Sequence, residues 1–246
     1  MSVQSAIHTI FAAQLVLLGL LCGVLLIRKG WKSFPVFAAY SLFNLISGLV
    51  EFFIYKYPKA YFYAFIVIES VAIILGLAVV YEVFVHLFSA QQALRRLATW
   101  LLGVAVLALG VLGFIVIQMH GVSLKNVGAG IIAAEEAARV LEVGSLSFLF
   151  VCSGTFGLHW RQPVFGIALG LSVFTTFELI LIAMRAYFGV NPAAGLNIAR
   201  MLAFGLGLLI WIGYLVAPER VQASDGIPER SQLEQWNRAV MELIHQ

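Results

Sequence analysis

Residues Ala6–Ile27 read AIHTIFAAQLVLLGLLCGVLLI, and the basic stretch RKGWK follows directly at residues 28–32. A helix needs roughly 20 mostly apolar residues to span a bilayer, and Ala6–Ile27 meets this requirement without Asp, Glu, Lys or Arg. A secretory signal peptide has its basic region before a shorter apolar core, whereas here the basic residues come after the apolar run. We therefore expect a retained transmembrane helix whose C-terminal end lies in the cytoplasm.

The composition of the whole chain points the same way. Of its 246 residues, 62% are hydrophobic and only 11% are charged, and the mean hydropathy is +0.98. A soluble domain has about a quarter of its residues charged, so this chain has too few for a water-facing surface. The net charge of +3 is small and its basic residues lie in short loops, so we expect no nucleic-acid partner. Cys22 and Cys152 lie in apolar segments and predict neither a disulfide framework nor a metal site.

Seven segments of the chain are long and apolar enough to span a bilayer. They are Ala6–Ile27, Phe34–Tyr55, Tyr61–Phe88, Leu97–Met119, Gly128–Leu158, Val164–Phe188 and Leu196–Ala217. We therefore predict an all-α, polytopic membrane protein. Its domains are a seven-transmembrane-helix bundle over residues 1–218 and a cytoplasmic tail over residues 219–246.

Lysine and arginine gather in alternate loops, which gives the predicted orientation. The first, third and fifth loops and the tail carry Arg28, Lys29, Lys32, Arg95, Arg96, Arg161 and Arg220. The second, fourth and sixth loops carry only Lys56, Lys59 and Lys125. Since an excess of Lys and Arg marks cytoplasmic loops, the N-terminus is predicted outside and the C-terminus inside.

The tail contains one predicted amphipathic helix. Residues 231–234, Ser-Gln-Leu-Glu, form a capping box, and apolar side chains then recur on one helical face from Leu233 to Ile244. Such a helix rests on the bilayer surface or docks on a partner protein. The partners we expect are therefore the lipid bilayer and a further membrane or cytoplasmic protein.

Ionisable and strongly polar side chains inside the spans are the candidate functional residues, because their burial in lipid is costly. The candidates are Asn44 in the second segment, Glu69 in the third, Glu135, Glu136, Arg139 and Glu142 in the fifth, Glu178 in the sixth and Arg200 in the seventh. All of them lie in the middle or the outer half of their spans. Glu51 and Arg185 lie nearer the outer ends, where we expect them to reach the interface.

Two interpretations of these residues are open. Arg139 lies four residues after Glu135 and three before Glu142, so structural ion pairs on one helix are expected. Glu69 and Glu178 are far from a helix end, and they either pair structurally or line a polar pocket that opens outward. A pocket with this excess of acids would suit a cationic or hydrogen-bond-donating ligand, or protons.

The sequence lacks the residues that several seven-helix chemistries require. Retinal proteins hold their pigment through a lysine in the last helix, and Leu196–Ala217 contains none. Glu-Glu-Ala-Ala-Arg at residues 135–139 is similar to the glutamate motif of intramembrane prenyl-protein proteases, which place the arginine one residue further on. Those enzymes also need a Phe-x-x-x-His pattern, and Phe156 and His159 are one residue too close. We therefore expect neither activity.

Haem bound between helices needs two inward histidines at similar depth. His86 and His159 lie near cytoplasmic helix ends, where histidines face headgroups or solvent, so we expect no haem and no other cofactor or metal. The sequence favours a non-enzymatic, receptor- or sensor-like module. The alternatives are a small-solute or proton-coupled transporter and an accessory subunit of a larger membrane complex. A closed apolar inner half favours sensing, whereas a polar path to the inner face favours transport.

Overall fold

The computed structural model describes residues 3–88, 100, 103, 124–155, 162–188 and 193–217. Most of the predicted span Leu97–Met119, the tail over residues 219–246 and His159 lie outside the described residues. Trp100 and Gly103, inside that predicted span, are helical.

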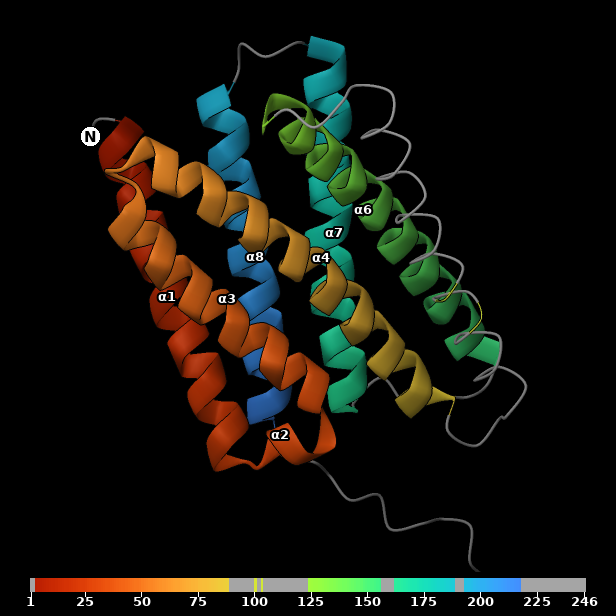
Figure 1. The fold of residues 1–246 in the computed structure, drawn as a ribbon. Coiled ribbons are helices and arrows are strands. Elements are labelled where there is room, and N and C mark those ends of the chain that lie inside the picture. Colours follow the sequence, from red (N-terminus) through yellow and green to blue (C-terminus); the bar gives the residue numbers. More distant parts are fainter. Residues whose placement is uncertain are drawn as a thin grey trace, which may run out of the picture.

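All secondary structure in the described ranges is helical, in agreement with the predicted fold class (Figure 1). The helices are α1 (Val3–Ile27), α2 (Gly30–Ser33), α3 (Pro35–Ile54), α4 (Pro58–Leu87), α6 (Leu124–Thr155), α7 (Pro163–Phe188) and α8 (Ala193–Val216). Five of them, α1, α3, α4, α7 and α8, are long and apolar enough to cross a membrane. The chain is therefore described as a multi-pass membrane protein. Helix α6 is also long but carries several charges in its first half.

Proline sets the start of three of these helices. Pro35, Pro58 and Pro163 are the first residues of α3, α4 and α7. Proline suits this position because its fixed φ matches the helix and its missing N–H would have no partner there. The predicted third segment began at Tyr61, which placed the start of α4 three residues too late. The short helix α2 was predicted as loop.

The six long helices pack in a closed ring. Helix α1 contacts α3 and α8, α3 contacts α4, α4 contacts α6, α6 contacts α7, and α7 contacts α8. Figure 1 shows that α1, α4, α6 and α8 end near the bottom of the view, where α3 and α7 begin. We call this the lower end of the ring and the opposite one the upper end. The predicted orientation makes the lower end cytoplasmic.

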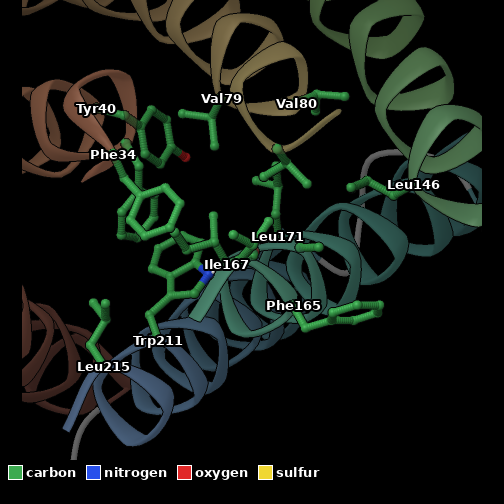
Figure 2. Close-up of a cluster of buried hydrophobic side chains, with 14 of the residues drawn as sticks. Phe34, Tyr40, Val79, Val80, Leu146, Phe165, Ile167, Leu171, Trp211 and Leu215 are labelled. Atoms are coloured by element: carbon green, nitrogen blue, oxygen red, sulfur yellow. Dashed lines mark hydrogen bonds between the residues drawn. The ribbon is translucent and has the colours of Figure 1, made fainter. Parts of the chain in front are cut away.

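Apolar side chains fill the lower half of the ring. Trp211 of α8 lies at the centre of this core, with its ring centroid 5.1 Å from that of Phe37. Its indole N–H donates to the carbonyl oxygen of Ile167 at 3.1 Å, so its polar atom is satisfied. Figure 2 shows labelled side chains of this core from α3, α4, α6 and α7, with Tyr40, Val79 and Ile167 on the side of Trp211 and Leu146 farther away. The described side chains of the lower half therefore pack against one another as one apolar layer.

Glycine lets α7 and α8 approach closely. A Cβ at Gly170 would lie 2.3 Å from Trp211 Nε1, and one at Gly166 would lie 2.2 Å from Tyr214 Cβ. Gly207 faces Gly170 across the same contact. Small residues allow such backbone proximity in membrane helices. These glycines are thus used for packing within the chain, whereas Gly205 has open space beside it.

Two charged side chains complete helix ends in the lower half. The carboxylate of Glu82 on α4 accepts hydrogen bonds from the backbone N–H groups of Val36 at 2.9 Å and Phe37 at 2.8 Å. These groups belong to the first turn of α3 and have no partner within that helix. Arg28 at the end of α1 donates to the carbonyl oxygens of Val216 and Ala217 at the end of α8. The buried Glu82 therefore has a structural role.

Candidate functional site

A cavity of about 330 Å³ lies above the apolar core, in the upper half of the ring. All six long helices contribute to its wall. Its polar lining is Gln14, Tyr40, Asn44, Ser47, Glu51, Glu69, Arg139 and Arg200. Its apolar lining includes Ile7, Phe11, Leu15, Leu18, Ile68, Phe174, Met201 and Phe204. Pockets for small molecules commonly have this mixture of an apolar wall and a few polar groups.

Glu178 of α7 joins the two arginines beside this cavity. One carboxylate oxygen faces the Nε of Arg139 on α6, and the other accepts a hydrogen bond from the Nε of Arg200 on α8. The Glu178 side chain is only 3% exposed. A carboxylate so deeply buried needs such partners to stay ionised, so the arginines explain its position. One acid thereby connects three helices.

Arg200 reaches two further acids. Its Nη2 donates to Glu135 Oε1 at 2.7 Å and lies 3.9 Å from Glu69 Oε1. Both arginines line the cavity, but the side chain of Arg200 keeps 35% of its surface exposed, whereas that of Arg139 keeps 7%. Arg200 is therefore the more accessible of the two cations for a ligand in the cavity.

Arg139 also forms an ion pair within its own helix. Its Nη1 donates to Glu142 Oε2 at 2.8 Å, and its guanidinium lies 5.1 Å from the ring centroid of Phe174. Glu142 is 0% exposed, and its other oxygen has no hydrogen-bond partner in the described part of the chain. That oxygen lies against Gly76 of α4, where a Cβ would come within 2.6 Å of it. The absence of a side chain at Gly76 thus makes room for the Glu142 carboxylate.

The charges of the network do not balance. Glu69, Glu135, Glu142 and Glu178 stand against the two arginines. Each arginine has its short contacts with two of these carboxylates. Within the described ranges the Glu69 carboxylate, by contrast, has only the 3.9 Å approach to Arg200. The cavity wall is therefore acidic where Glu69 lines it.

One face of α3 supplies a second polar strip to the wall. Asn44, Ser47 and Glu51 are spaced three and four residues apart, so they follow one another up the same side of the helix. The Asn44 amide donates to the Tyr40 carbonyl oxygen at 2.8 Å, and the Ser47 hydroxyl donates to the Asn44 carbonyl oxygen at 3.2 Å. The Glu51 carboxylate makes no hydrogen bond or ion pair with the described residues. It is therefore the second acid available to a ligand.

The structure brings together most of the residues that the sequence singled out. Glu69, Glu135, Arg139, Glu142, Glu178 and Arg200 form one ion network, and Asn44 lines the cavity beside it. Glu136 is exposed and makes no ion pair in the described part of the chain, because one residue turns the helix by about 100° away from Glu135. Glu135 does not pair with Arg139 on its own helix, but with Arg200.

The sequence analysis did not place Glu51 in the site. This carboxylate, which we expected to reach the outer interface, lines the cavity together with Glu69. Gln14 of α1 was also missed; its amide donates to the carbonyl oxygen of Met201 on α8 and forms part of the wall. The side chain of Arg185 lies outside the described part of the structure.

We compared the chain with family models, curated proteins and solved structures. None matches it.

Proposed function

We propose that this chain is a non-enzymatic, receptor- or sensor-like membrane module. It binds a small solute in the cavity from the outer side, and it acts through another protein at the cytoplasmic side. The upper end of the ring then faces outward and the lower end inward, as loop charge predicts.

One observation carries this proposal: a polar cavity in the upper half lies directly above a closed apolar lower half. The cavity is lined by Glu51, Glu69 and Arg200, whereas the layer below it is packed around Trp211 and Phe37. The buried acid of the lower half, Glu82, is bonded to the backbone N–H groups at the start of α3 and does not extend the polar lining of the cavity. Binding on one side without passage to the other is the geometry of a sensor.

Helix α8 provides the connection between the two halves. It carries Arg200 in the cavity wall and Trp211 in the core, and its last carbonyl oxygens accept hydrogen bonds from Arg28. A ligand that changes the contacts of Arg200 acts on one end of a rigid helix whose other end is held at the lower side. A ligand shifts a conformational equilibrium only if it makes different contacts in the two conformations.

The alternatives draw on other features. A small-solute or proton-coupled transporter is supported by the carboxylates in the cavity, but it requires the layer around Trp211 to open. An accessory-subunit role would be favoured if small residues such as Gly166, Gly170, Gly205 and Gly207 formed a strip that faces lipid. Three of these glycines, Gly166, Gly170 and Gly207, lie in the contact between α7 and α8, and only Gly205 of this set has open space beside it.

The proposed function is tested with the full chain in proteoliposomes that carry a fluorescent label on Ala217→Cys, after replacement of the two native cysteines. The probes are 2-phenylethylamine, 3-phenylpropionate, 2-phenylethanol and glucose, added from outside. A probe that stabilises the protein, changes the fluorescence at position 217 and does not accumulate inside supports sensing. Saturable accumulation would show transport instead. Failure of all four probes to stabilise the protein would contradict ligand binding.

A further inference from the structure

We propose that the cavity takes a small organic cation, with its ammonium group beside Glu51 and Glu69 and its apolar body against the aromatic wall. This inference rests on the proposed ligand-binding function and names the chemical class of the ligand.

The groups that a ligand in the cavity can reach have an excess of negative charge. Arg139 and Arg200 each have two close carboxylate contacts, so acids of the network already offset their positive charge. Among the described residues Glu69 has only one distant contact, at 3.9 Å, and Glu51 has none. An anion beside Arg200 would meet repulsion from Glu51 and Glu69. A cation would supply the missing opposite charge.

The relative position of these two acids also favours a cation. Glu51 comes from α3 and Glu69 from α4, which are neighbours in the ring. Both carboxylates line the same cavity. A single ammonium group in this region therefore lies in the field of two acids. Its three N–H donors match carboxylate acceptors and the carbonyl oxygen of the Asn44 amide.

The lining of the cavity favours an organic cation over a metal ion. Calcium needs six to eight oxygen ligands, and magnesium needs a near-octahedral set. The wall also has the oxygen-bearing side chains of Gln14, Tyr40 and Ser47, but the described residues include no group of three His, Cys, Asp or Glu that could hold a metal ion. The apolar part of the wall, with Phe11, Leu15 and Phe204, offers no oxygen ligands. Aromatic rings and apolar side chains instead suit the hydrocarbon part of an amine, and ring faces attract cations. A cavity of about 330 Å³ is near the lower limit for small-molecule pockets, so the ligand is small.

The test measures binding of three matched probes to the purified full chain. They are 2-phenylethylamine, protonated at neutral pH, its neutral analogue 2-phenylethanol, and the anion 3-phenylpropionate. We expect the amine to bind most tightly. Glu51→Gln and Glu69→Gln should each weaken its binding by roughly 10- to 100-fold, because each removes a charged partner of the ammonium group. Glu136→Gln, on the exposed side of α6, is the matched control and should leave binding unchanged.

The outcomes separate this inference from the proposed function. Equal affinity for the alcohol, or amine binding that is unaffected by both Gln variants, would overturn the cation assignment while leaving a ligand site possible. Accumulation of the amine in proteoliposomes, with binding lost in the variants, would support the cation and contradict sensing. If none of the three probes binds, the inference is overturned. Glu51 makes no ion pair with the described residues, so we expect Glu51→Gln to fold. If Glu69→Gln does not fold, the binding measured with Glu51→Gln tests the inference.

Discussion

Loss of the buried ion pair between Arg139 and Glu142 should lower the free energy of unfolding. Glu142 is 0% exposed, and Arg139 is its only charged partner in the described structure. Arg139→Met leaves this carboxylate buried without a counter-charge, whereas Glu178 keeps Arg200. Removing one partner of a buried pair costs about 3–5 kcal/mol. For a chain of this size that corresponds to a melting temperature lower by roughly 6–20 °C.

The double variant Arg139→Met/Glu142→Leu should recover most of this loss. It removes the stranded carboxylate together with its partner and replaces both by apolar groups of similar size, which is often neutral or stabilising. Glu142→Leu alone should cost less than Arg139→Met, because Arg139 then still faces Glu178. Both variants keep the contacts of Arg200 with Glu135 and Glu178.

The assay is thermal unfolding of the purified full chain in detergent, followed by loss of helical circular dichroism. All four members of the cycle are compared at one detergent concentration. If the double variant is as unstable as Arg139→Met, the loss does not come from a stranded Glu142. The buried-pair account of the network would then be refuted.

Three further predictions follow from the packing and the orientation. Gly170→Ala should lower the melting temperature of the detergent-purified chain by roughly 2–12 °C, because its Cβ would overlap Trp211, whereas Gly205→Ala should leave it unchanged or higher. Glu82→Gln should cost about 1–3 kcal/mol, because an amide oxygen can replace only one of two carboxylate acceptors; an unchanged unfolding temperature would argue against this role. Lys56→Cys in a background without native cysteines should react with an impermeant thiol reagent from outside, and reaction from the cytoplasmic side alone would reverse the predicted orientation.

Much of the fold could be predicted from hydropathy alone. A bilayer permits only segments whose backbone polar groups are satisfied internally, so long apolar runs must be helices. The five helices that are apolar enough to span a membrane all coincide with predicted segments. Helix ends were less predictable, because a proline such as Pro58 can begin a helix before the apolar run does.

The membership of the site was only partly predictable. Because a charged side chain is costly in lipid, residues such as Glu178 can be predicted to face inward. Which acid pairs with which arginine, however, depends on how each helix is rotated against its neighbours. The choice of Arg200 as the partner of Glu135 could not be derived from spacing along α6. The cavity-facing strip on α3 did leave a signal, since Asn44 and Glu51 are seven residues apart and fall on one helical face.

The central claim is a cavity that is open to the outer side above a layer that is closed to the inner side. Thiol accessibility in intact, oriented vesicles tests it, with Ser47→Cys in the cavity wall and Val79→Cys in the buried layer, each in a background without native cysteines. We predict that a charged, impermeant reagent modifies position 47 from outside only and modifies position 79 from neither side. Modification of position 47 from the cytoplasmic side would contradict the claim and would show a path through the protein.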